Sequence, residues 1–207
     1  MVKPAMPDWG RLDETLALLA TPPPAEPLAR YRAEIQQDNG AHYYLAVVQH
    51  PSLFAACHDL RGLVNLFVDF YEHRQEVERL LDRLAESQIA CVDLLAGTGV
   101  HGVMGYDDWG LQDRPLISPA LWRRLFAPRY RRVWQHAHSR GLDVWLHSCG
   151  YILPLLDMMI ECGLNVVQMD QQENMGLENL ARVAGGRLAF WCPVDIQATM
   201  ARGSPEE

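Results

Sequence analysis

The chain has 207 residues, of which 49% are hydrophobic and 21% charged, and its formal net charge is −8. The acidic balance argues against non-specific nucleic-acid binding, which needs a basic surface, and the composition is that of a globular protein rather than a disordered one. No apolar run approaches the ~18 residues of a membrane span, and residues 1–10 lack the basic-then-apolar order of a secretion signal. We therefore expect a cytoplasmic protein that binds neither nucleic acid nor membranes.

The cysteine content also favours the cytoplasm. There are five cysteines, an odd number thinly spread along a chain without a signal, which argues against a disulfide framework. Each is then a buried apolar residue, a metal ligand or a reactive thiol. Cys57, Cys91 and Cys162 lie beside apolar residues on predicted helices, so we expect them in the core.

Residues 1–40 predict a helical and irregular N-terminal segment. A short amphipathic helix is expected at 11–20, and the three prolines at 22–24 end it because proline cannot continue a helix. Aromatic and β-branched residues at 42–48 predict a strand. Pro51 is typical of a first helical residue, and apolar residues at helical spacing predict helical structure over 60–95.

From residue 100 onward, predicted strands and helices alternate. Strands are expected at 100–106, 142–146, 164–169 and 187–191, and helices at 118–140, 152–162 and 177–184. This alternation predicts parallel βαβ units, and the apolar strands indicate a sheet covered on both faces. We expect an α/β fold of about five parallel strands with helices outside.

Five strands are too few to close a (β/α)₈ barrel, which usually needs about 200–250 residues. The pattern at 204–207 (SPEE) is typical of a helix start. We therefore predict that residues 41–207 form part of a TIM (β/α)₈ barrel, truncated at the C-terminus. A small open α/β sheet is the alternative.

Polar and reactive side chains follow four consecutive predicted strands. In parallel α/β proteins, chemistry gathers at the carboxyl ends of the strands, so these side chains are expected to share one rim. They are Asp107 and Asp108; His147, Ser148 and Cys149; Asp170, Gln171 and Gln172; and Cys192, Asp195 and Gln197.

The His147-Ser148-Cys149 run indicates a metal site. Residues two apart in an extended segment point to the same side, and nitrogen with soft sulfur suits tetrahedral Zn²⁺. Cys192 follows a strand two steps along the sheet and is the candidate for a second thiolate. Three protein ligands and one open position would make a catalytic zinc site. The alternative is chance spacing, with Cys192 a small residue under a loop.

The acidic residues of this rim allow two interpretations. Asp107, Asp108 and Asp195 are candidates to bind a substrate, accept a proton or hold a cation, and carboxylates also cap helices at strand–helix junctions. Trp109 is a candidate pocket wall or a core residue. Gly97, Gly99 and Gly102 do not make a dinucleotide-binding fingerprint, because they follow a predicted helix and lead into a strand rather than the reverse. The chain also has no Walker lysine, so nucleotide binding has little support.

Several stretches resemble the uroporphyrinogen decarboxylase superfamily, in particular its methyltransferase-related branch. They are YDDWGLQ (106–112), ISPALWRRLFAPRYRRV (117–133), LHSCGYI (146–152), FWCPVDIQ (190–197) and GSPEE (203–207). The resemblance runs from about residue 60 to the end. It implies a TIM barrel that binds a small-molecule substrate at the carboxyl ends of its strands.

The methyltransferase branch implies zinc-dependent methyl transfer to a thiol such as coenzyme M. The methyl donor would be a corrinoid, either a substrate or a cofactor carried by a partner protein. The resemblance implies that His147 and Cys149 bind Zn²⁺ with a later cysteine, although Cys192 lies earlier than such enzymes would place it. Asp107 and Asp195 would be catalytic. The remaining expected substrate-binding residues are Asp108, Trp109, Gln112, Asp170, Gln172 and Gln197.

Two other functions stay open. Decarboxylation of a tetrapyrrole in porphyrin biosynthesis needs neither metal nor cofactor, and would place Asp107 or Asp195 near the pyrrole groups. The arginine-rich N-terminal motif of those decarboxylases is not found here. The third hypothesis, after methyl transfer and decarboxylation, is an inactive barrel fragment whose exposed sheet edges favour association.

Overall fold

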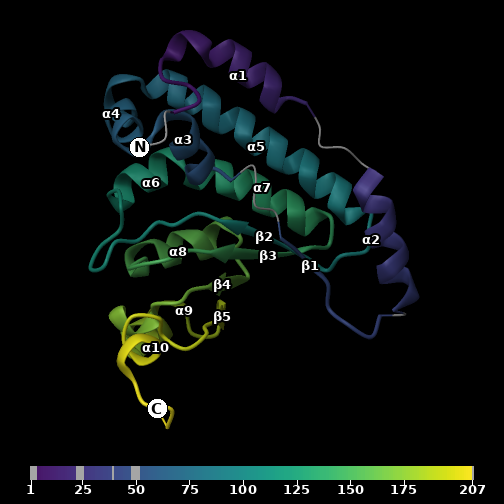
Figure 1. Cartoon of the computed structure of the whole chain (residues 1–207), viewed down its shortest axis with the longest axis vertical. Helices are drawn as coiled ribbons and strands as arrows, with labels where there is room; N and C mark the ends of the chain where they lie inside the picture. Colours follow the sequence, from purple (N-terminus) through teal and green to yellow (C-terminus); the bar gives the residue numbers. More distant parts are fainter. Residues whose placement is uncertain (1–3, 22–25, 39, 48–51, 207) are drawn as a thin grey trace.

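Five parallel strands form the centre of the molecule (Figure 1). The computed structural model describes residues 4–21, 26–38, 40–47 and 52–206. Each strand pairs in parallel with the next one in the sequence, and the intervening helices lie outside the sheet. This is the partial (β/α)₈ barrel expected from the sequence. The strands are β1 (Leu45–Val47), β2 (Gly102–Tyr106), β3 (Asp143–His147), β4 (Val166–Gln168) and β5 (Ala189–Trp191).

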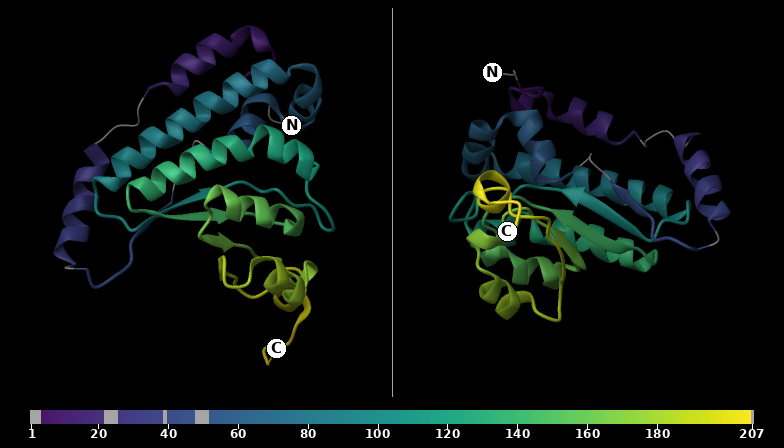
Figure 2. Two further views of the ribbon diagram at one scale, coloured as in Figure 1. Left: turned by 180° about the vertical axis from the view of Figure 1, so that it is seen from behind. Right: turned by 60° about the horizontal axis from the view of Figure 1, so that its bottom comes forward.

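Helices cover the outer face of this sheet (Figure 2). Helices α5, α7 and α8 pack in a row against it, and α1 lies on the side of α5 that faces away from the strands. Within the described ranges, none of the helices is both long and apolar enough to cross a membrane. The helices are η1 (Trp9–Arg11), α1 (Leu12–Leu19), α2 (Glu26–Gln37), α3 (Phe54–Arg61), α4 (Leu63–Glu72), α5 (Arg74–Ala96), α6 (Pro119–Leu125), α7 (Ala127–Ser139), α8 (Leu153–Cys162), η2 (Gln172–Asn174), α9 (Leu177–Ala184) and α10 (Thr199–Arg202).

Alternation along β3 separates the core from the concave face of the sheet. Val144 and Leu146 are buried against the helices, whereas Trp145 and His147 point to the other face and are half-buried. The strand register places Tyr106 of β2 and Gln168 of β4 directly beside His147. A row of polar and aromatic side chains therefore crosses the sheet at its carboxyl end.

Two long predicted helices are each interrupted. The helical region expected at 60–95 is divided at Gly62, whose φ is +78°, and at His73, whose backbone leaves the helical region. The helix expected at 118–140 breaks at Phe126. Pro128 explains this break, since it has no N–H to donate to the preceding turn.

One helix was not expected, and two further expectations concern the starts of helices. Helix α2 is not among the predicted elements, because the prolines at 22–24 indicate where a helix ends and not that another follows. Pro51 lies outside the described residues, and α3 begins at Phe54. The helix start expected at Ser204 stays a prediction, because only 205–206 are described beyond it and they form a turn. A first helical turn needs more residues than this to close a hydrogen bond.

A buried ion pair fastens the N-terminal segment to the barrel portion. The Nε of Arg61 lies 2.7 Å from Asp69 Oδ2, and both side chains are almost fully buried. The Trp9 ring stacks on the guanidinium of Arg61, whose central carbon lies 4.4 Å from the ring centroid. The indole N–H of Trp9 donates to Asp69. Arg61 also donates to the carbonyl of Met6. The division of the chain at residue 40 stays a prediction.

Replacing Arg61 with leucine should lower the free energy of unfolding by about 3–5 kcal/mol, because the Asp69 carboxylate would be left buried without a counter-charge. Urea denaturation measures this loss. Arg187→Leu is the control, since Arg187 also lies 2.7 Å from its partner Asp157 but both side chains are about half-exposed. The control should cost about 1 kcal/mol or less, and equal losses in the two variants would contradict this account.

Candidate metal and active site

Three ligand atoms of different chemistry meet at the carboxyl ends of β2 and β3. The Nε2 of His147 lies 3.4 Å from Asp108 Oδ1 and 3.3 Å from Cys149 Sγ. All three ligand atoms lie within 4.8 Å of one another. The expectation that His147 and Cys149 project together is confirmed, and Asp108 joins them from the neighbouring loop.

Backbone hydrogen bonds hold the two loops in this arrangement. The amide of Asp107 donates to the carbonyl of His147 over 3.1 Å, which extends the β2–β3 ladder past the strand ends. The amide of Gly110 donates to the Cys149 carbonyl over 3.0 Å. In return, the Cys149 amide donates to Asp108 Oδ1 over 2.8 Å. The carboxylate is thereby aimed at the histidine and the thiol.

Two glycines allow the loops to touch. A Cβ on Gly110 would overlap the backbone of Gly150 and Tyr151, and a Cβ on Gly150 would overlap the backbone of Gly110. Gly150 also has a φ of +79°, a conformation that other residues rarely adopt. Both positions therefore need glycine for the triad to assemble.

The three groups perturb one another electrostatically. The Asp108 carboxylate, and after it Cys149, raise the pKa of His147 to about 11. The imidazole in turn holds the pKa of the Asp108 carboxyl below its usual range. The cluster therefore favours a positive charge at Nε2, whether a proton or a metal ion.

The donor set fits Zn²⁺. One imidazole nitrogen, one thiol and one carboxylate are all common zinc ligands, and three protein ligands are typical of catalytic sites. The Asp108 side chain is 59% exposed whereas that of His147 is 14% exposed. The triad therefore has a side open to a fourth ligand.

Cys192 does not belong to this group. It is exposed at the end of β5, two strands from His147, and the triad that the described residues form does not include it. Partial burial of the sulfur and the nearby Asp170 carboxylate raise the pKa of the Cys192 thiol, which opposes formation of a thiolate. The geometry favours Asp108 over Cys192 as the third ligand.

Asp107, predicted to be catalytic, lies in the interior. Its carboxylate accepts hydrogen bonds from the amides of Leu53 and Ala55 at the start of α3, and from the Tyr130 hydroxyl at 2.5 Å. Burial raises the pKa of Asp107 to about 6, an effect that these donors oppose. The arrangement favours a helix-capping role.

Trp109, expected to line a pocket, is completely buried. It packs against Phe54 and Phe126, with ring centroids 4.5 and 4.6 Å apart, and its indole N–H donates to Tyr130. Its amide donates to Ser148 Oγ over 3.0 Å. Trp109 thus anchors the loop that carries Asp108 to the hydrophobic core.

Asp195, the second predicted catalytic acid, also accepts hydrogen bonds from backbone amides. It is buried, and its Oδ1 accepts from the amides of Gln197 and Ala198 just before α10. The side chain of Gln172 donates to the carbonyl of Pro193, and Gln112 is exposed and accepts through its carbonyl from Asn174. A substrate-binding role for Gln112, Gln172 and Gln197 stays a prediction.

Sequence reasoning missed Gln168. Its Oε1 contacts the Nδ1 of His147, and its Nε2 lies 2.5 Å from Asp170 Oδ1. One signal was available: Gln168 is a polar residue in an otherwise apolar strand. Its importance depends on the register between β3 and β4, which places it beside His147.

Gly150→Ala should cost about 1–3 kcal/mol of unfolding free energy more than Gly141→Ala, because the new methyl group collides with the Gly110 backbone. Gly141 is a matched control: its φ is +76°, and a Cβ there would meet nothing within 4 Å. Thermal or urea denaturation compares the two variants. Similar losses would mean that the contact between the loops is not tight.

Comparisons with known proteins agree on the fold. A sequence model described as uroporphyrinogen decarboxylase (URO-D) matches residues 52–207. No curated protein matches the chain. Among solved structures, a methyltransferase from Methanosarcina mazei is similar, with a TM-score of 0.63 at 20% identity. The match covers 79% of this chain but 46% of the methyltransferase, so the chain spans less than half the length of that structure.

Proposed function

Because the chain belongs to the uroporphyrinogen decarboxylase family, we propose that it is a zinc-dependent enzyme of that family that transfers a methyl group to a thiol. The methyl donor is a corrinoid, free or carried by a partner protein. The convergence of Asp108, His147 and Cys149 carries the proposal. The similarity in fold to a methyltransferase supports it.

In this proposal the chain's own residues hold the ion and orient the substrate. His147 Nε2, Cys149 Sγ and Asp108 Oδ1 are the ligands, and the exposed side of Asp108 faces the incoming thiol. A bound zinc ion would supply Lewis acidity, which keeps a thiol deprotonated near neutral pH. Tyr106 and Trp191, on the same row of the concave face, offer apolar surface for the methyl group.

Methyl transfer then balances without an external oxidant or reductant. The thiolate sulfur forms a bond to the methyl carbon while the cobalt–carbon bond of the donor breaks. Cobalt leaves as Co(I) with the bonding electron pair. The protein must hold sulfur, carbon and cobalt in line, and this positioning accounts for much of the rate in such reactions.

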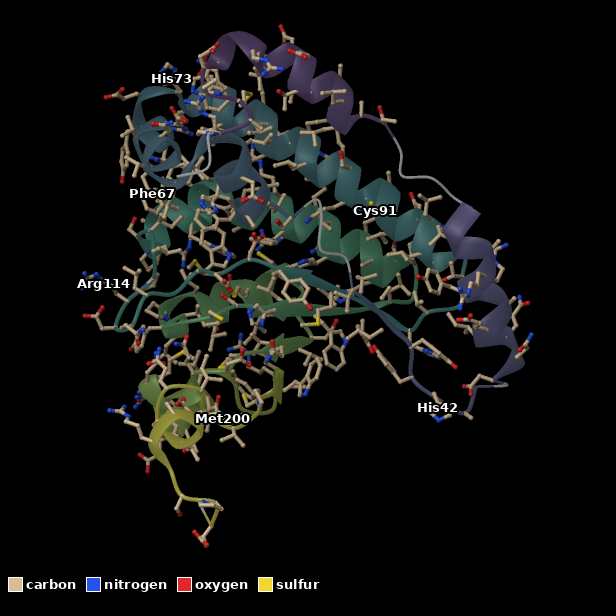
Figure 3. All side chains as sticks on the ribbon, viewed as in Figure 1. His42, Phe67, His73, Cys91, Arg114 and Met200 are labelled. Atoms are coloured by element: carbon tan, nitrogen blue, oxygen red, sulfur yellow. The ribbon has the colours of Figure 1, made fainter. Side chains whose placement is uncertain are left out.

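Decarboxylation of a tetrapyrrole is less well supported by this site. Such a substrate carries many carboxylates and needs basic partners. Of the arginines in the described part of the chain, Arg114 is the one that lies in a loop following a strand, and it is exposed beside Asp113 (Figure 3). Asp107 and Asp195 are both engaged with backbone amides.

Zinc stoichiometry tests the ligand set. The purified protein should bind one Zn²⁺, and Cys149→Ser, His147→Ala or Asp108→Asn should each weaken binding by at least about tenfold, because each removes one of three ligands. Elemental analysis after dialysis, with a chelator competition titration, measures this. Cys192→Ser is the matched control for Cys149→Ser and should retain full zinc.

The same variants test the reaction. With methylcobalamin as donor and 2-mercaptoethanesulfonate or another small thiol as acceptor, the appearance of cob(I)alamin under anaerobic conditions reports methyl transfer. Activity should require zinc and be lost in Cys149→Ser but kept in Cys192→Ser. Zinc-independent decarboxylation of uroporphyrinogen by the purified protein would contradict the proposal.

A further inference from the structure

We propose that Gln168 and Asp170 form a hydrogen-bonded relay that fixes the orientation and tautomer of His147. The inference rests on the proposed zinc site and assigns positioning residues to it. The relay runs along the concave face from the end of β4 to β3, on the side of the imidazole opposite Asp108 and Cys149.

The first link joins neighbouring strands. Register pairs Gln168 with His147, so the two side chains stand next to each other on one face of the sheet. The Oε1 of Gln168 meets the Nδ1 of His147. An amide oxygen only accepts hydrogen bonds, so Nδ1 must carry the proton. The other ring nitrogen, Nε2, is then the one that can exchange its proton for an ion.

The second link sets the direction of the amide. The two ends of a glutamine amide differ only in donor and acceptor character, so its orientation depends on its partners. Asp170 Oδ1 lies 2.5 Å from Gln168 Nε2, and a carboxylate accepts but does not donate. The amide nitrogen is therefore turned toward Asp170 and the oxygen toward His147.

Both ends of the relay are anchored. The backbone carbonyl of Asp170 accepts from the amide of Ile196 over 3.1 Å, which ties this position to the loop after β5. At the other end, the ring of Tyr106 lies 5.2 Å from that of His147 at an angle of 46°. The imidazole is thus held between a ring on β2 and an amide on β4.

The consequence is a ring nitrogen that is aimed before any ion arrives. The Nε2 of His147 faces Asp108 and Cys149 at 3.4 and 3.3 Å. Hydrogen bonding at the distal nitrogen of a histidine ligand orients the ring and makes it a better donor. We therefore assign Asp170 to this relay rather than to direct contact with substrate.

Zinc affinity is the readout that tests the relay. Gln168→Leu should raise the Kd for Zn²⁺ by about 10–100-fold, the usual effect of losing a partner behind a metal ligand. Chelator competition measures the Kd, and Co²⁺ substitution reports the coordination through its visible absorption bands. Gln135→Leu makes the same change on the exposed surface of α7 and should leave the Kd unchanged.

Exchanging the two side-chain types distinguishes a hydrogen-bonded relay from a role in packing alone. Gln168→Glu alone places two carboxylates side by side. Their repulsion disfavours the state in which both are charged and disturbs the hydrogen bond between positions 168 and 170. Combining Gln168→Glu with Asp170→Asn restores one carboxylate and one amide in the opposite order. The carboxylate at position 168 then accepts from Nδ1, and the amide at position 170 donates to it.

We expect the double variant to bind Zn²⁺ at least tenfold more tightly than Gln168→Glu alone and to recover the wild-type Co²⁺ spectrum. If the wild-type protein binds zinc, but Gln168→Leu binds it equally well or the double variant shows no recovery, the relay is overturned while the proposed function stands. If the wild-type protein binds no zinc, both proposals fail. The comparison of single and double variants remains decisive even if Gln168→Leu does not fold.

Discussion

The arrangement of the site depends on the close contact between the loops that follow β2 and β3. Glycines at 110 and 150 let the two backbones meet, and the hydrogen bond from the Cys149 amide to Asp108 then turns that carboxylate toward His147. Neither loop alone provides three ligand atoms. The sheet brings the strand ends to the same rim, but contact between the loops decides which side chains converge there.

Much of the fold could be predicted from the sequence, because hydrophobic periodicity and glycine or proline punctuation act locally. The alternation after residue 100 specifies parallel strands in order, and the structure has them. The helix interruption at His73 was harder to predict, because no glycine or proline marks it, whereas Pro128 marks the interruption at Phe126. Helix α2 was missed because a run of prolines that ends one helix says little about the next.

The site was predicted less completely than the fold. The spacing of His147 and Cys149 predicts that their side chains lie together, since alternate residues of an extended strand share a side. Spacing does not show which carboxylate has free oxygens: Asp107 turns inward to cap α3, whereas its neighbour Asp108 turns outward. The role of Gln168 depends on strand register, which no local pattern encodes.

X-ray absorption spectroscopy at the zinc edge tests the central claim most directly, because it reports the atoms bound to the ion. The account predicts one sulfur ligand at about 2.3 Å and the remaining ligands nitrogen or oxygen at about 2.0–2.2 Å in the protein without added thiol. Addition of a thiol substrate should raise the sulfur count to two. Two sulfur ligands before any thiol is added would mean that a second cysteine, rather than Asp108, completes the site.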